Sequence, residues 1–272
     1  MIENNLESAS MANFISSFVS FNQRLSRRLN NLLPESVRQD GNSFFRTKIL
    51  PGIFTNGDVV YDLGGGKQPF VTSEIKSRWS LKVVGLDISA AELESAPPGV
   101  YDSTIVANLC DFKGNSDADI VICQATLEHV HDTRGAIEAI ASILKTCGRA
   151  YIFAPSRNAA FARLNLLLPQ SVKEKILYLL LPQTEGSQGF PATYDQCTPS
   201  ELEALFREFN LRVVERKLFW MSTYFMVLSP LFVVWRLWQG IFYLLARANA
   251  AETFIYVVQR EESGNHNKFG SI

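Results

Sequence analysis

The stretch that decides the fold reads Val59-Val60-Tyr61-Asp62-Leu63-Gly64-Gly65-Gly66-Lys67-Gln68-Pro69. Its first five residues predict a short buried strand, because apolar and aromatic side chains dominate them. The glycines that follow allow positive φ and let the backbone approach a ligand closely. The stretch therefore predicts the first strand and the ligand-binding turn of an α/β domain.

The residues around these glycines indicate which ligand the turn accepts. A dinucleotide fingerprint would read G-x-G-x-x-G, but Pro69 stands where the last glycine belongs. Asp62 lies two residues before Gly64, where its carboxylate would repel a pyrophosphate. The same carboxylate suits a ligand that carries an ammonium and a sulfonium. The turn therefore favours S-adenosylmethionine (SAM) over a dinucleotide.

A second acidic residue supports a nucleoside ligand. Asp87 ends the next apolar stretch about 20 residues past the glycine turn, the spacing at which an acid accepts hydrogen bonds from ribose hydroxyls. Alone, Asp87 is equally explained as a helix cap, because Ser89 and Ala90 follow it. Together with Asp62 and the glycines it predicts a cofactor site, to which we also assign the neighbouring Ile88.

The remaining chain alternates short apolar strands with helical stretches, which predicts a parallel sheet with helical crossovers. The expected strands are Val59–Leu63, Lys82–Asp87, Ser103–Ala107, Asp119–Cys123, Arg149–Ala154, Leu211–Phe219 and Glu252–Gln259. The expected helices of this region are Thr72–Ser77, Ala90–Ser95, Arg134–Leu144 and one that begins at a capping box, Thr198 to Glu201, and continues to about Phe209.

Composition excludes some classes of protein. The 272 residues include 26 basic and 27 acidic side chains, so a nucleic-acid binder that works by bulk charge is excluded. Four isolated cysteines without zinc-ligand spacing suggest a reducing compartment and no metal site. Only 19% of the residues are charged and 47% are apolar, which is a low charge content for a soluble domain.

Two regions outside the strand pattern are strongly apolar. Apolar residues at helical spacing from Met11 to Leu29, followed by arginines, predict an amphipathic leader helix that either caps the domain or lies on a membrane. A short helix from Ser43 to about Leu50 is expected next. Between Leu218 and Ala246 only Arg236 is charged, and Pro230 interrupts the run. We rank an interfacial helical hairpin first there, a buried substrate lid second and a membrane span third.

Several motifs together resemble the class I SAM-dependent methyltransferases, in the small-molecule branch related to ubiquinone and menaquinone methyltransferases. The resemblance covers about residues 55–260 and rests on the glycine turn, on Asp87 and on three further stretches: Asp119 to Val130 with its Glu-His pair, Leu144 to Arg149, and Thr198 to Leu202. Thr146 and Cys147 depart from the usual Pro and Gly of the second stretch. The family implies a Rossmann-like, seven-stranded, mostly parallel sheet whose last strand is antiparallel.

The resemblance also implies roles for individual residues. Gly64, Gly65 and Gly66 would approach the methionine part of SAM, Asp62 its amine and Asp87 its ribose. Gln124 would lie beside the methionine part, and Lys67 is either solvated or near the methionine carboxylate. Asn108 stands where the family often has an Asp that faces the adenine amine, with Asp111 as the alternative.

The family's chemistry requires in-line approach and a deprotonated acceptor. His129 and Tyr194 are the candidate catalytic residues, and His131 and Asp195 are further candidates. A purely structural role for the Glu-His pair is the alternative. The stretch from Phe190 to Asp195 resembles a lid loop, or else is a plain connector.

These inferences predict a cytoplasmic SAM-dependent methyltransferase that acts on a hydrophobic or lipid-linked small molecule at the membrane surface. The predicted organisation is a helical leader at 1–54, a catalytic domain at 55–262 with apolar insertions at about 158–196 and 219–249, and a flexible tail at 263–272. The alternatives are an NAD(P)-binding Rossmann oxidoreductase and a non-catalytic membrane-associated protein with a degenerate methyltransferase fold.

Overall fold

The computed structural model describes residues 2–168 and 191–262, and it divides into two compact units. We call the first the sheet unit; it consists of Gly41–Arg157, Ala192–Leu218 and Thr253–Ile272. We call the second the helical unit; it consists of Met1–Asp40, Asn158–Pro191 and Phe219–Glu252. The predicted tail at 263–272 lies outside the described residues.

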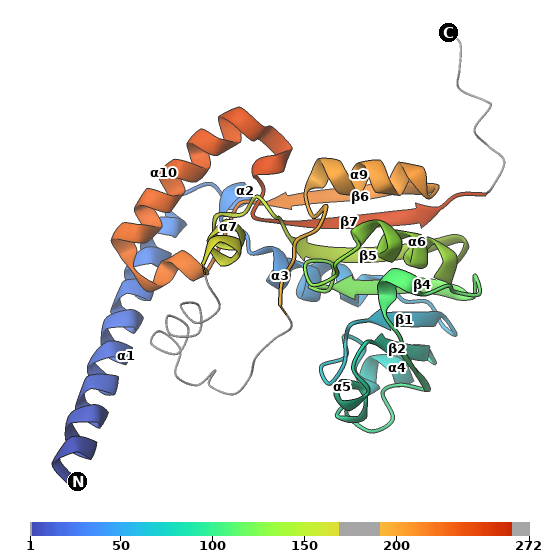
Figure 1. Ribbon diagram of the computed structural model, residues 1–272, viewed down its shortest axis with the longest axis horizontal. Helices are drawn as coiled ribbons and strands as arrows, with labels where there is room; N and C mark the ends of the chain where they lie inside the picture. Colours follow the sequence, from blue (N-terminus) through green and yellow to red (C-terminus); the bar gives the residue numbers. More distant parts are fainter. Residues whose placement is uncertain (1, 169–190, 263–272) are drawn as a thin grey trace. The chain divides into compact units, whose positions relative to one another are not determined.

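The sheet unit is built on seven strands in the order β3-β2-β1-β4-β5-β7-β6 (Figure 1). The strands are β1 (Val59–Leu63), β2 (Lys82–Asp87), β3 (Ser103–Val106), β4 (Ala118–Gln124), β5 (Leu144–Pro155), β6 (Leu211–Phe219) and β7 (Thr253–Arg260). β1 to β5 pair in parallel, whereas β7 runs antiparallel to β5. This arrangement confirms the predicted sheet and its antiparallel final strand.

Four helices connect strands of the sheet unit, and polar side chains cap the first three of them at their starts. They are α4 (Ser73–Trp79), α5 (Ala90–Glu94), α6 (Thr133–Ile143) and α9 (Pro199–Glu208). Ser89 and Asp132 accept hydrogen bonds from the backbone N–H groups of Glu92 and Gly135, which satisfies donors that the first turn leaves unpaired. The apolar face of α6 is buried against β4 and β5.

The predicted capping box of α9 forms differently. Thr198 is the residue before the helix, but its hydroxyl donates to the Glu201 carboxylate at 2.6 Å and accepts no backbone N–H. Arg157 also donates to that carboxylate and holds it in place. The two side chains of the box therefore satisfy each other.

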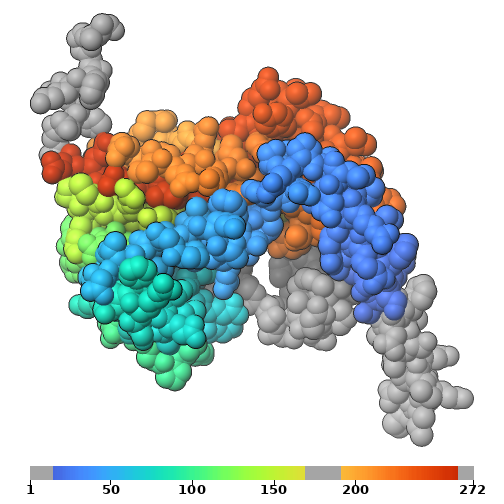
Figure 2. Space-filling model, turned by 180° about the vertical axis from the view of Figure 1, so that it is seen from behind, coloured from blue at the N-terminus to red at the C-terminus, as the bar shows by residue number. Residues whose placement is uncertain are grey.

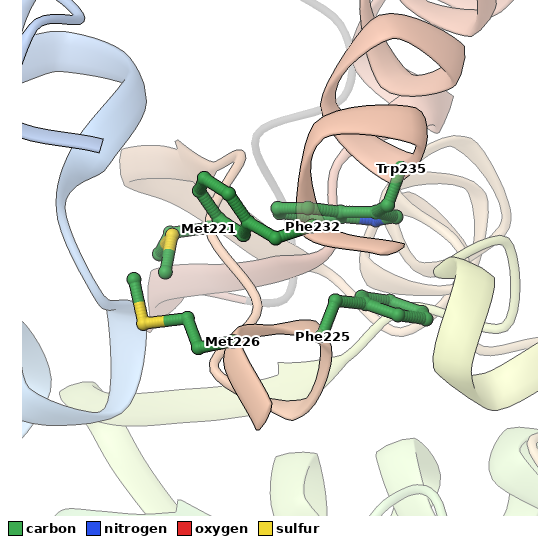
Figure 3. Close-up of a cluster of buried hydrophobic side chains, with 5 residues drawn as sticks. All are labelled: Met221, Phe225, Met226, Phe232 and Trp235. Atoms are coloured by element: carbon green, nitrogen blue, oxygen red, sulfur yellow. The ribbon is translucent and has the colours of Figure 1, made fainter. Parts of the chain in front are cut away.

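The helical unit contains α1 (Ile2–Asn31), α2 (Glu35–Arg38), α7 (Ala160–Leu167) and α10 (Ser229–Ala246), with 3₁₀ turns at Tyr224–Val227 and Arg247–Ala250. Helix α1 packs along α10, and the two lie side by side in both views (Figures 1 and 2). The core of this unit is a cluster of buried side chains that comprises Met221, Phe225, Met226, Phe232 and Trp235 (Figure 3).

Helix α10 is joined to α1 by hydrogen bonds at its own first turn. Asn22 of α1 accepts from the backbone N–H of Ser229 at 3.0 Å and from its hydroxyl at 2.7 Å. Leu228 precedes the helix and has no side chain that could cap it, so α1 supplies the cap. Ser26 of α1 also donates to the Met226 carbonyl at 3.1 Å.

Three sequence-based expectations are wrong in detail. The leader helix begins at Ile2, well before Met11. The short helix after it begins at Gly41 as α3 (Gly41–Phe44) and continues as a π-helix over Phe45–Ile49. The apolar run forms a 3₁₀ turn and one helix, with no hairpin, because Pro230 lies in the first helical turn, where its missing N–H costs nothing.

Candidate functional site

The glycine turn after β1 is shaped by a close approach to the end of β4. Gly64 has φ of +73°, and its N–H donates to the Leu86 carbonyl at 2.8 Å. A Cβ at Gly64 would lie 2.5 Å from Oγ1 of Thr126, which itself donates to the Leu63 carbonyl at 2.9 Å. Only glycine fits this place, for both conformational and steric reasons.

Asp62 is a fully buried carboxylate directly over the turn. A Cβ at Gly65 would lie 2.6 Å from both carboxylate oxygens. Oδ2 accepts from the Phe70 N–H at 2.9 Å and from the Tyr101 hydroxyl at 3.5 Å, whereas Oδ1 has no hydrogen-bond partner in the described part of the chain. Burial raises the pKa of Asp62 to about 7. An unpaired buried carboxylate is costly unless a ligand donor or cation meets it.

Asp87 brings a second carboxylate to the same edge. Its Oδ1 accepts from the Ser89 N–H at 2.9 Å, and burial raises its pKa. Gly66 has φ of +45°, and a Cβ there would lie 3.2 Å from Asp87 Oδ2. The two carboxylates repel each other across the turn, so the negative charge of Asp87 raises the pKa of Asp62 further. This edge is therefore suited to a cationic ligand with hydroxyl donors.

Tyr101 completes this corner, and the sequence reasoning missed it. Its hydroxyl reaches both Asp62 Oδ2 and the Gly66 carbonyl, the latter at 3.3 Å. Its ring lies on Gly85, where a Cβ would come within 2.8 Å of it. A glycine inside a strand signals a close neighbour, so Gly85 was the available hint.

Gln124 at the end of β4 is 5% exposed and holds an unpaired acceptor toward the same edge. Its amide donates to Oδ1 of Asn42 in α3, while its own Oε1 is buried without a partner in the described residues. Phe45, fully buried with its ring 6.0 Å from that of Phe153, anchors α3 to the sheet unit. No sequence pattern pointed to Asn42.

Three further predicted cofactor residues are described by the structure. Asn108 donates to Asp111 at 2.8 Å and accepts from the Cys110 N–H at 3.1 Å, so its side chain caps a 3₁₀ turn. Ile88 is 59% exposed directly after β2. Lys67 forms an ion pair with Glu92 at 3.0 Å, on the turn's exposed side.

The Glu-His pair lies after β4 and is tied to the Tyr194 segment. The carboxyl of Glu128 is buried, with Oε2 unpaired in the described residues, and burial raises its pKa to about 8. His129 Nε2 is 3.9 Å from Glu128 Oε1. The Glu128 carbonyl accepts from the N–H groups of Thr193 and Tyr194 at 2.8 and 2.9 Å. Tyr194 is 3% exposed and has φ of +52°.

The other two catalytic candidates have structural contacts. Asp195 accepts from the Thr133 N–H at 2.9 Å and so holds the start of α6. His131 Nδ1 lies 3.8 Å from Cys110 Sγ. The predicted lid is described only from Pro191 onward, since residues 169–190 are outside the described part. Among residues 2–168 and 191–262, no group of three or more His, Cys, Asp or Glu side chains could hold a metal ion.

The sheet unit thus brings Asp62, the three glycines and Asp87 together at the carboxyl edge of β1 and β2, with Gln124 at the end of the adjacent β4. Asp195 instead serves the helix start, and Lys67 pairs with Glu92. Within residues 2–168 and 191–262, the hydrogen bonds to the Asp62 and Asp87 carboxylates come from backbone N–H groups and a tyrosine hydroxyl and from no basic side chain, so the arrangement would suit a cationic ligand.

A family model described as "Methyltransferase domain" matches residues 22–216. Among curated proteins, a ubiquinone biosynthesis O-methyltransferase of Cupriavidus pinatubonensis is 28% identical over 170 residues, which cover 59% of this chain and 63% of that protein. The protein with the same description from Erwinia tasmaniensis is 30% identical over 141 residues, covering 48% of this chain and 52% of its own length. The chain thus spans less than two thirds of these relatives.

Solved structures share the fold at low identity. A SAM-dependent methyltransferase from Mesorhizobium loti superimposes with a TM-score of 0.53 at 15% identity, covering 81% of this chain and 99% of that one. Phosphoethanolamine N-methyltransferase 2 of Haemonchus contortus, solved in complex with SAM, gives a TM-score of 0.51 at 15% identity and covers 84% of this chain and 55% of that one.

Proposed function

The chain belongs to the methyltransferase family, and from that premise we propose that it transfers a methyl group from SAM to an apolar small-molecule acceptor at a membrane surface. The observation that carries the proposal is the pair of buried carboxylates, Asp62 and Asp87, around a turn that only glycine can form.

The residues of the turn fit SAM one by one. Asp62 Oδ1, buried without a partner in the described residues, is the acceptor for the amino group. Asp87 is the acceptor for the ribose hydroxyls, Ile88 offers an apolar surface beside it, and Gln124 Oε1 is a further unpaired acceptor. The bound cofactor supplies an electrophilic methyl group on its sulfonium. The protein's own task is to fix that group and exclude water.

We assign proton removal from the acceptor to His129. Its side chain is 33% exposed, so a ligand can reach it, and Glu128 Oε1 lies 3.9 Å from its Nε2. Tyr194 is the second proposed catalytic residue; its backbone is tied to Glu128, which supports a common role for this corner.

The helical unit supports an apolar acceptor and a membrane surface. Side chains of α10 leave a broad apolar face exposed: Leu231, Val233, Val234, Leu237, Trp238, Ile241, Tyr243, Leu244 and Leu245. Exposed apolar patches of this kind mark interaction sites. The curated relatives are described as enzymes of ubiquinone biosynthesis, which also supports an apolar acceptor. A cytoplasmic position at the membrane is part of this proposal.

The connections of α10 favour a helix that lies on the membrane surface and disfavour one that spans the membrane. Ser229–Ala250 is the one stretch in the described chain that is long and apolar enough to span a membrane, and only 22% of it is buried. However, the Glu252 N–H donates to the Phe219 carbonyl at 2.9 Å, so the insertion starts and ends at one point. A single helix that crossed a hydrocarbon core of about 30 Å would separate these ends.

Calorimetry with SAM and with NADH tests the cofactor assignment. We expect SAM to bind the purified chain and NADH not to bind. Asp87→Ala should weaken SAM by about 1–3 kcal/mol, because it removes the ribose acceptor. Glu94→Ala, which removes an exposed carboxylate from the following helix α5, is the matched control and should bind as the wild type does. An unchanged dissociation constant in Asp87→Ala would refute the site.

A further inference from the structure

A second candidate binding site lies wholly within the helical unit. It is an open groove of about 600 Å³, within the size range of small-molecule sites. Its lining comes from α1, the segment through α2, the residue after β6, and α10: Leu29, Leu33, Ser36, Val37, Trp220, Phe232, Val233, Arg236, Leu237, Gln239, Gly240 and Tyr243. Most of these side chains are apolar, so the groove suits a hydrocarbon chain.

The groove also contains the positive charge of Arg236, whose hydrogen-bond partners carry no negative charge. The guanidinium of Arg236 donates to the Trp220 carbonyl at 2.8 Å, to Gln239 Oε1 at 2.9 Å and to Asn30 Oδ1 at 2.5 Å. All of these acceptors are neutral. The guanidinium also lies over the Trp235 ring, 4.7 Å from its centre.

Glu252 is the carboxyl that acts electrostatically on Arg236, and it is a weak counter-charge. Its Oε1 accepts hydrogen bonds from Trp235 Nε1 at 3.1 Å and from the Ala160 N–H at 3.4 Å. Burial raises the pKa of Glu252 to about 7, so it is partly protonated at neutral pH. Burial also lowers the pKa of Arg236 to about 10, which still leaves it charged. Arg236 is the one charged side chain among the residues that line the groove, and Glu252 does not line it, so the lining is positive.

Two donors in the groove lining have no acceptor in the described part of the chain. They are Nε of Arg236 and Nε2 of Gln239. Both nitrogen atoms are buried, so bulk solvent does not reach them in this conformation of the two side chains. A buried donor without an acceptor costs about 1–3 kcal/mol, and an anionic ligand oxygen would recover that cost. Gln239 lines the groove, so a rotation of its side chain presents the amide to such a ligand.

We propose that this groove binds a single-chain anionic amphiphile, with its acid group at Arg236 and Gln239 and its chain along Leu29, Leu33 and Leu237. The apolar lining accounts for the chain, and the unbalanced guanidinium with two unpaired donors accounts for the acid group. The inference does not rest on methyl transfer, because every residue of the groove belongs to the helical unit.

Tryptophan quenching on the full chain tests the proposal. Trp220 lines the groove, and bromine quenches tryptophan fluorescence at short range. We expect bromoundecanoate to quench fluorescence saturably at concentrations where light scattering detects no micelles. The neutral bromoundecanol should bind about tenfold or more weakly, since it lacks the charge. Quenching that appears only with micelles, or equal binding of acid and alcohol, would overturn the proposal.

A variant that fills the groove tests the position of the chain without disturbing the fold. Gly240 lines the groove, and a Cβ added there meets no atom within 4 Å. Gly240→Leu should fill the space and reduce bromoundecanoate binding by tenfold or more, about 1.4 kcal/mol, while the helix gains stability. Gly240→Ala is the matched control and should keep the binding. Equal binding in both variants would contradict the proposal, whatever either variant does to SAM affinity.

Discussion

At the residue scale, burial makes Asp62 unfavourable for folding, and the proposed function assigns to it the amino group of SAM. Its pKa is raised to about 7 by burial, so the folded state holds its proton where the unfolded state has released it. The free energy of unfolding therefore falls as pH rises from about 4 toward 7 because of this group. A residue that destabilises the fold in this way is best explained by what it binds.

Asp62→Asn should separate these two effects. The amide keeps an acceptor for the Phe70 N–H but carries no charge, so we expect the free energy of unfolding at pH 8 to rise by about 1–3 kcal/mol. SAM binding should be lost or greatly weakened. Urea unfolding and calorimetry measure the two quantities, and a variant that is both less stable and a normal SAM binder would contradict this account.

The same residue predicts a pH dependence of cofactor binding. The amino group of SAM needs the ionised carboxylate, so the wild type should bind SAM more weakly below pH 7, by up to about tenfold per pH unit. Binding should release a proton, visible as a dependence of the calorimetric heat on the buffer. A SAM affinity that stays flat between pH 5 and 8 would show that Asp62 does not meet the cation.

Gly64→Ala tests whether the turn excludes a side chain by sterics as well as by conformation. Gly64 combines φ of +73° with a clash at 2.5 Å, whereas Gly99 has φ of +80° and nothing within 4 Å. We expect Gly99→Ala to cost about 1 kcal/mol from strain alone and Gly64→Ala to cost more and to weaken SAM. Urea unfolding of both variants measures the difference; equal costs would mean that Thr126 simply moves aside.

The residues that the sequence could reveal are those whose role is written in local spacing. The sequence predicted Asp62, the glycines and Asp87 because they stand at the ends of two strands with a characteristic spacing. Tyr101 and Asn42 reach the site from elsewhere in the chain, through tertiary contacts that no local pattern encodes. The contact between Asp195 and Thr133 was hidden from the sequence for the same reason, because the two residues are 62 positions apart.

At the scale of elements, the strands were predictable and the apolar insertion was not. Strand alternation gave β1, β2 and β6 with their observed ends, because β-branched residues and turns mark both limits. The segment around Pro230 contains no such marks, and proline is compatible with a helix start as well as with a break. Asn22, which caps α10 by accepting from the Ser229 N–H, is 207 positions away from Ser229, so this cap could not be seen in the sequence.

The exposed face of α10 makes a prediction about membrane contact. Leu244 and Leu245 are 66% and 77% exposed, so charged substitutions there should leave the fold intact. The double variant Leu244→Glu, Leu245→Glu should reduce sedimentation with vesicles of phosphatidylcholine and phosphatidylglycerol by about tenfold or more. The reason is that the bilayer would bury the two leucine side chains, which contributes a few kcal/mol to binding.

A variant of the sheet unit supplies the control for this experiment. Val213 and Val214 on β6 are 38% and 42% exposed, and the double variant Val213→Glu, Val214→Glu introduces the same two charges outside the helical unit. It should sediment with vesicles as the wild type does. If both variants behaved alike, or if neither changed sedimentation, α10 would not be the membrane-binding element.

At the scale of the whole molecule, buried carboxyl groups set the pH dependence of stability. Burial raises the pKa of Asp62 to about 7, of Glu128 to about 8 and of Glu252 to about 7. The folded chain therefore binds more protons than the unfolded chain between about pH 4 and 8, and stability falls across that window. Asp102 and Asp119 act in the opposite sense, because their pKa values are lowered and their contribution is lost in acid.

We therefore expect maximal thermal stability near pH 5 and a lower melting temperature at pH 8, measured by circular dichroism. Glu128→Gln should flatten the profile of the wild type between pH 5 and 8, as Asp62→Asn should. A melting temperature that rises steadily from pH 5 to pH 8 would contradict the assignment of these carboxyls as protonated when folded.

The order of the strands also has a consequence for how the protein is made. β6 is an edge strand whose neighbour in the sheet is β7, and β7 is the last strand among the residues that the structure describes. On the ribosome, β6 therefore emerges before β7, and its backbone hydrogen-bonding groups stay unpaired while the apolar segment between the two strands is translated. A nascent chain that stalls there exposes an unpaired strand next to an apolar helix. Chaperone dependence during synthesis should therefore be concentrated in the period between the synthesis of β6 and that of β7.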